Sequence, residues 1–135
     1  MVLRWVLALL VIFSGFAVAG ILGGLATDIA GFWHLPGAGS SAAFAVVVVA
    51  YLAAPTHKLL AATVALVLGA VTAWLVLEPS FYPESYGDRG AYEPTHLPIV
   101  VTYIGGLFGL FASVLIKRWA GPNNSFKPNP LRGSA

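Results

Sequence analysis

Four long runs without a charged side chain restrict the class of fold that this sequence can adopt. They cover residues 5–26, 37–54, 59–77 and 97–116. An α-helix rises about 1.5 Å per residue, so about 20 apolar residues cross the ~30 Å hydrocarbon core of a bilayer. Membrane β-strands would alternate apolar and polar residues over about ten positions, and these runs do not alternate. The sequence therefore predicts an all-α, polytopic membrane protein with four transmembrane helices, of which residues 37–54 form the shortest.

The composition excludes several other classes of protein. Hydrophobic residues make up 59% of the chain and charged residues only 9%, with a mean hydropathy of +0.86. A soluble domain has about 25% charged residues, so this chain has too little polar surface to cover a soluble fold. The absence of cysteine excludes disulfides and thiolate metal sites. The formal net charge is only +2, and the basic residues do not cluster with aromatic ones, so nucleic-acid binding has no support.

The charged residues segregate when the four runs are threaded through a membrane. One side receives most of the basic residues, namely Arg4, Lys58, Lys117, Arg118, Lys127 and Arg132. The other side receives all the acidic residues, namely Asp28, Glu78, Glu84, Asp88 and Glu93, together with Arg89. Lys and Arg are enriched in cytoplasmic loops, so both termini are predicted to be cytoplasmic and the loop at 78–96 external.

The tryptophans support the same threading. Trp5 and Trp119 fall near the inner interface, and Trp33 and Trp74 fall near the outer one. Indole rings favour the headgroup level at both surfaces of a membrane. We therefore expect a transmembrane domain at 1–119. The tail at 120–135 is rich in Pro, Asn, Gly and Ser and is expected to be disordered in the cytoplasm.

The first run has a second interpretation. Arg4 followed by an apolar stretch and Ala17-Val18-Ala19 is also typical of a cleaved signal peptide. The apolar run continues through Leu25 to a full spanning length, which favours an uncleaved helix.

Residues at the helix ends carry capping signals. Thr56 is placed to cap the third helix, and the short connection at 55–58 predicts an antiparallel pair of helices. Thr95 or His96 is placed to cap the fourth helix, with Pro98 in its first turn.

Small residues at four-residue spacing predict the faces through which the helices pack, because helices in lipid associate by close approach of their backbones. The first helix offers Gly15, Ala19 and Gly23; the third offers Ala61, Ala65, Gly69 and Ala73; the fourth offers Gly105, Gly109 and Ser113. We expect these stripes to pack within the four-helix bundle. In the alternative, the stripe of the fourth helix joins two copies of the chain.

None of the four runs contains an ionisable Asp, Glu, Lys, Arg or His. Such residues inside a membrane normally mark ion or proton pathways, so proton-coupled transport is disfavoured. A pore would have to be lined by backbone or by scattered hydroxyls such as those of Thr63, Thr72, Thr102 and Tyr103. We expect them to bond to helix backbone instead.

The external loop contains candidate ligands for a divalent cation. These are Glu93, His96, Asp88 and Glu84, since carboxylates and imidazole suit such ions. Pro94 biases Glu93 away from helical geometry, which weakens the Glu-x-x-His match at 93–96. A solvated acidic loop is the favoured interpretation, with neither a metal site nor a cofactor assigned.

The same loop contains four aromatic residues. Phe81, Tyr82, Tyr86 and Tyr92 suit the headgroup level of a membrane or the surface of a docked partner.

Two short segments near the basic side complete the candidates. His57 and Lys58 offer a contact for anionic lipid headgroups, although a polar turn is the simpler interpretation. The sequence Asn-Ser-Phe-Lys-Pro-Asn-Pro-Leu-Arg-Gly at 124–133 resembles a C-terminal tail that occurs on unrelated small bacterial proteins and derives from a repeated DNA element. That resemblance implies a bacterial source, and therefore a bacterial inner membrane as the expected location. It says nothing about activity.

These features favour a non-enzymatic accessory or interaction protein that works through its helix faces and the loop at 78–96. Its expected partners are the lipid bilayer and a membrane protein or further copies of itself. The alternative function is a small transporter or channel that acts as a homo-oligomer.

Overall fold

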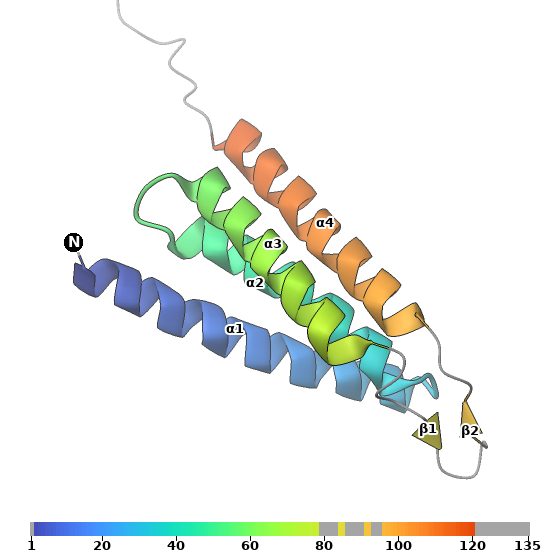
Figure 1. Ribbon diagram of the computed structural model, residues 1–135. Helices are drawn as coiled ribbons and strands as arrows, with labels where there is room; N and C mark the ends of the chain where they lie inside the picture. Colours follow the sequence, from blue (N-terminus) through green and yellow to red (C-terminus); the bar gives the residue numbers. More distant parts are fainter. Residues whose placement is uncertain (1, 79–83, 86–90, 93–95, 121–135) are drawn as a thin grey trace, which may run out of the picture.

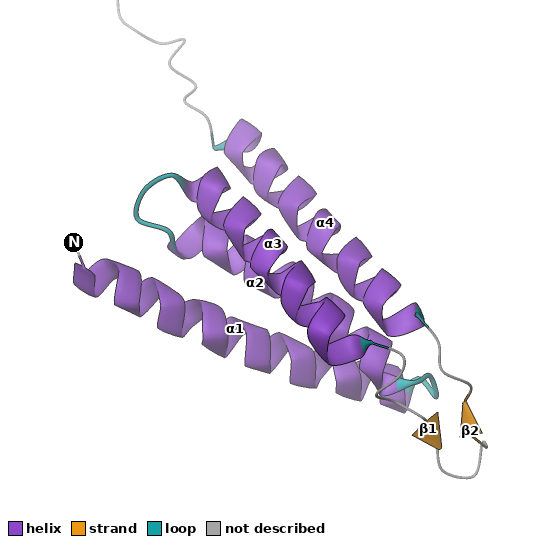
Figure 2. Cartoon of the chain, viewed as in Figure 1, coloured by secondary structure: helices purple, strands orange, loops and turns teal. Residues whose placement is uncertain are grey.

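The computed structural model describes residues 2–78, 84–85, 91–92 and 96–120. It contains α1 (Val2–Ile29), α2 (His34–Ala53), α3 (Lys58–Leu77) and α4 (Leu97–Trp119), as Figure 2 shows. All four helices are long and apolar enough to cross a membrane, which confirms the predicted all-α membrane fold. Between α3 and α4, β1 (Glu84–Ser85) and β2 (Ala91–Tyr92) form a short antiparallel pair.

The helices extend beyond the uncharged runs of the sequence. α1 covers Val2–Ile29 rather than 5–26, α2 begins at His34 rather than 37, and α4 ends at Trp119 rather than 116. Absence of charge marks the part of a helix that suits hydrocarbon, whereas backbone hydrogen bonds continue into the polar headgroup layer. Counting uncharged residues therefore underestimates helix length.

The end of α1 shows the local signal that a count of apolar residues misses. The Gly31 N–H donates to the Asp28 carbonyl and the Phe32 N–H to the Thr27 carbonyl, both at 2.9 Å. Gly31 has φ 79°, a left-handed conformation that glycine adopts without steric cost. This is a Schellman motif, and Gly31 is the residue that ends α1.

The predicted cap of the third helix is wrong. The N-cap residue of α3 is His57, in a left-handed conformation (φ 49°, ψ 46°), and it makes no side-chain capping hydrogen bond. The His57 carbonyl accepts the first helical bond from Ala61, at 3.0 Å, so Thr56 lies one residue outside the capping position. The N-cap of α4 is His96, also without a side-chain bond, and Pro98 lies in the first turn as predicted.

α2 lies at the centre of the bundle and packs against each of the other three helices (Figure 1). α3 and α4 also pack against each other, whereas α1 lies along α2. Successive helices run in opposite directions, so the chain's N-terminus, the α2–α3 loop and the end of α4 lie at one end of the bundle. The α1–α2 turn and the β1–β2 pair lie at the other end.

The two ends differ in charge. Arg4, Lys58 and the Lys117–Arg118 pair belong to the first end, and Asp28 and Glu78 belong to the second. This separation follows from the antiparallel order of the helices. The assignment of the basic end to the cytoplasm stays a prediction.

The distribution of side-chain size is opposite to that of a soluble protein. A small core forms where Val47, Tyr51 and Ala62 meet, with Leu59, Leu66 and Leu110 packed against it. Most large apolar side chains point outward; Leu22 and Phe108, for example, are each 61% exposed. Large side chains outside and small residues between helices are typical of a bundle whose surroundings are lipid.

Candidate functional site

The contacts between helices are the best-defined candidate site in the described part of the chain. Small residues bring α1 and α2 together near the α1–α2 turn. A Cβ atom on Gly23 would lie 2.7 Å from the Gly37 carbonyl oxygen, and one on Gly37 would lie 2.9 Å from the Gly23 carbonyl oxygen. Neither distance is possible for a real side chain, so each glycine is required by the other helix. The Ser41 hydroxyl adds a bond between the helices, donating to the Ala19 carbonyl at 2.8 Å.

The predicted stripe of the fourth helix lies against α2. A Cβ atom on Gly105 would lie 2.8 Å from the Ser40 Cα, and one on Gly109 would lie 2.8 Å from the Phe44 carbonyl oxygen. Ser113 is fully buried and donates to the Gly109 carbonyl at 2.8 Å. Because α2 of the same chain covers this face, the face is not available to join two copies.

The remaining predicted packing residues divide into two groups. Gly15 on α1 lies against α2, since its Cβ position is 3.2 Å from the Val49 Cγ2. On α3, Ala65 is half-buried and Ala73 is buried, but the Cβ position of Gly69 has nothing within 4 Å. Four residues exceed one helical turn by about 40°, so a four-residue stripe drifts around a straight helix. The stripe of α3 therefore cannot stay in contact with one neighbour along its whole length.

Sequence reasoning missed the packing role of α2. This helix carries an uninterrupted run of small residues at 37–43. Gly37 and Ser41 contact α1, whereas Gly39 and Ser40 contact α4 at Thr102 and Gly105. A four-residue spacing of small residues identifies one packing face per helix, whereas a continuous run of small residues creates two. The run at 37–43 was the sequence signal that α2 packs against two neighbours.

Most of the hydroxyl groups on the helices bond to backbone, as predicted for Thr63, Thr72 and Tyr103. Thr63 donates to the Leu59 carbonyl and Thr72 to the Leu68 carbonyl, each at 2.9 Å, while Tyr103 donates to the Ala70 carbonyl at 3.2 Å. Other hydroxyls that donate to a backbone carbonyl are those of Thr27, Ser40, Ser41 and Ser113. Thr102 differs, because its buried Oγ1 has no hydrogen-bond partner among the described residues.

The candidate metal ligands are not brought together by the described residues. Asp88 and Glu93 lie outside the described residues, Glu84 belongs to β1, and His96 is an exposed residue at the start of α4. Within residues 2–78, 84–85, 91–92 and 96–120, no three His, Cys, Asp or Glu side chains group closely enough to hold a metal ion. The tail resemblance at 124–133 and the aromatic residues at 81, 82 and 86 also lie outside the described residues.

The fold thus presents close helix contacts, backbone-bonded hydroxyls and an apolar outer surface. No protein-family model, no curated protein and no solved structure matches this chain.

Proposed function

We propose that this protein is a non-enzymatic accessory or interaction component of a bacterial inner membrane, with both termini in the cytoplasm. The observation that carries the proposal is that the polar side chains between the helices bond to backbone carbonyls. Small residues such as Gly23 and Gly105 bring backbones together, and hydroxyls such as those of Ser41 and Ser113 bond to carbonyls. Such an interior holds helices in place and leaves few polar groups to lead a solute across.

The outer surface supports the same proposal. On α4, Leu107, Phe108 and Phe111 are each about 60% exposed and present large apolar side chains. Such a surface suits either lipid or the helix of another membrane protein. The loop at 78–96, with its acidic and aromatic residues, is the longest polar segment between the spans. It would supply the contacts outside the bilayer.

A transporter or channel ranks second because the described helices lack a polar stripe. Thr63 and Thr72 are exposed on α3 and lie nine residues apart. Nine residues make about two and a half turns, so these hydroxyls project from roughly opposite sides of the helix. They also already bond to their own backbone. A homo-oligomeric pore lined by α3 would expose only one of them.

Purification of the tagged full-length chain in a mild detergent, with identification of every co-purifying protein, tests the proposal. We expect a second membrane protein in a fixed ratio to this chain. A homo-oligomer of defined mass without any partner would contradict the accessory role and support the channel, which a flux assay in liposomes would then examine.

Two matched double variants would then locate the contact with the partner. Phe108→Ala with Phe111→Ala alters the outer face of α4, and Phe13→Ala with Phe16→Ala makes the same change on α1. All four side chains are exposed, so the fold should tolerate both pairs. Loss of the partner in one pair alone identifies the helix that binds it.

A further inference from the structure

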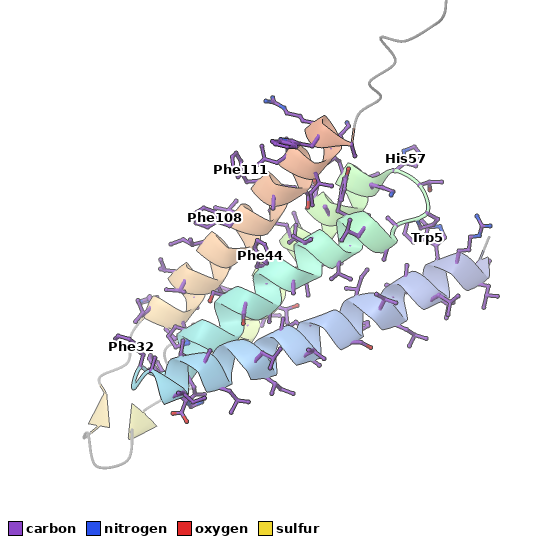
Figure 3. All side chains as sticks on the ribbon, turned by 180° about the vertical axis from the view of Figure 1, so that it is seen from behind. Trp5, Phe32, Phe44, His57, Phe108 and Phe111 are labelled. Carbon is purple, nitrogen blue, oxygen red and sulfur yellow. The ribbon has the colours of Figure 1, made fainter. Side chains whose placement is uncertain are left out.

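A cleft opens between α1 and α2 at the basic end of the bundle. Figures 1 and 3 show the two helices close together near the α1–α2 turn and further apart toward the chain's N-terminus. The cleft has a volume of about 710 Å³. It is an open groove along the helix pair rather than an enclosed cavity.

The residues between α1 and α2 differ along the length of the helix pair. Near the turn, the contact is made by Gly23 and Gly37, which let the backbones touch. Toward the N-terminus, leucine and valine side chains lie on both walls of the cleft. These are Leu7 and Val11 on α1 and Val49 and Leu52 on α2. Ala8, Ala53 and Ala54 add to the lining, so both walls of the cleft are apolar.

Two cations line the same cleft from different helices. Arg4 belongs to α1, and Lys58 is the first residue of α3, yet both contribute to its wall. The Lys58 Nζ also lies 5.9 Å from the centre of the Tyr51 ring. Figure 3 shows Trp5 and His57 at this end of the bundle as well. Asp28 and Glu78, acidic residues of the described helices and their caps, belong to the opposite end, so neither neutralises these cations.

We infer that this cleft binds one phospholipid with an anionic headgroup. The phosphate lies between the Arg4 guanidinium and the Lys58 ammonium, and an acyl chain lies between α1 and α2. Arginine and lysine both bind phosphate, arginine through two parallel hydrogen bonds. The apolar walls suit the acyl chain, and the cations sit where helices that span a membrane meet the headgroups. This inference holds whether or not a protein partner is found, because it needs only the membrane embedding of the four helices.

The test compares lipids on the full-length protein in a non-ionic detergent. Native mass spectrometry counts the lipids retained by each chain, and titration with phosphatidylglycerol or phosphatidylcholine gives the affinities. We expect one retained phosphatidylglycerol per chain and a clear preference over phosphatidylcholine. Glycerol 1-phosphate, which has the anionic group without acyl chains, should not compete. Equal affinity for the two lipids, or effective competition by glycerol 1-phosphate, would overturn the inference.

A matched pair of charge variants separates the cleft from general attraction to a basic surface. Arg4→Gln with Lys58→Gln should weaken phosphatidylglycerol binding by about 25-fold, because each cation near anionic lipid contributes about fivefold. Lys117→Gln with Arg118→Gln removes the same charge at the same end but outside the cleft, and should leave the affinity nearly unchanged. An equal loss of phosphatidylglycerol affinity in the two double variants would show that the lipid is attracted to the basic end in general, and would overturn the inference.

Two further variants exclude an effect on folding. Arg4→Lys with Lys58→Arg keeps both charges and should retain the lipid. Ala53→Phe fills the cleft without changing a charge, so it should reduce lipid retention. Helical content by circular dichroism and elution volume confirm the fold of each variant. Undiminished lipid retention by a folded Ala53→Phe protein would place the acyl chain elsewhere and overturn the inference.

Discussion

Glycine has different roles in this protein, and the surroundings of each glycine decide which one applies. Gly105 lies against the backbone of α2 at Ser40, so the contact leaves no room for a side chain. Gly31 has a positive φ and ends α1. Gly69, in contrast, lies in a regular helix with nothing near its Cβ position. The same residue type is therefore required at two of these positions and dispensable at the third.

This difference predicts opposite outcomes for two equivalent substitutions. Gly105→Leu should destabilise the bundle by about 1–3 kcal/mol or more, because α4 must move away from α2 to admit the side chain. Gly69→Leu should leave stability unchanged or raise it by up to about 1 kcal/mol, because leucine favours a helix more than glycine does. Thermal unfolding in detergent measures both. Similar losses in the two variants would contradict the packing of α4 on α2.

At the scale of whole helices, α2 organises the bundle. Its run of small residues at 37–43 presents a smooth surface to α1 through Gly37 and to α4 through Gly39. Helices in lipid gain little from burying apolar side chains, so a helix that two neighbours can approach closely becomes the centre. α1 has α2 as its main neighbour, which leaves most of its surface exposed.

The absence of cysteine allows the α1–α2 contact to be tested by crosslinking. The Cβ position of Gly15 lies 3.8 Å from the Val49 Cβ, which is within the usual range of about 3.5–4.5 Å for a disulfide. We expect Gly15→Cys with Val49→Cys to form an intramolecular disulfide on mild oxidation, detected as a faster-migrating band on a non-reducing gel.

A control variant makes the crosslinking result specific. Gly69→Cys with Val49→Cys should not form this bond, because no side chain lies within 4 Å of the Gly69 Cβ position. Adding Gly23→Leu to the first pair should reduce its yield, since it forces α1 away from Gly37 of α2. An equal yield in the two cysteine pairs would mean that α1 does not hold its position on α2.

For the whole molecule, the difference in basic residues between the two ends is the property that predicts its orientation. Arg4, Lys58, Lys117 and Arg118 belong to the end that carries the chain's N-terminus. Basic residues are retained on the cytoplasmic side during insertion, whereas acidic residues contribute little. The predicted orientation follows from this rule.

Single cysteines test the orientation directly. Ser85→Cys, in the segment between α3 and α4, should react with a membrane-impermeant maleimide on intact bacterial cells or spheroplasts. Thr56→Cys, in the α2–α3 loop, should react only after the membrane is opened. The cysteine-free parent chain controls for background. The reverse labelling pattern would place both termini outside the cytoplasm.

The class of fold and the number of spans follow from the amino-acid sequence alone. Hydropathy is a sum over neighbouring residues, so a run such as 97–116 specifies a spanning helix without reference to any other segment. The hydropathy pattern predicted the positions of the helices to within a few residues. The exact helix ends depend on local signals, of which Gly31 is the clearest.

The pairing of helix faces, in contrast, is visible only in the folded bundle. Helix pairing in lipid depends on the fit between two surfaces, and each surface is read from a different part of the chain. For this reason Gly105 could be identified as a packing residue, but not its partner Ser40, and Gly69 was assigned a contact that it does not make. Arg4 and Lys58 are far apart in sequence, and they share a cleft only because the antiparallel order of the helices brings the start of α1 and the start of α3 to the same end of the bundle.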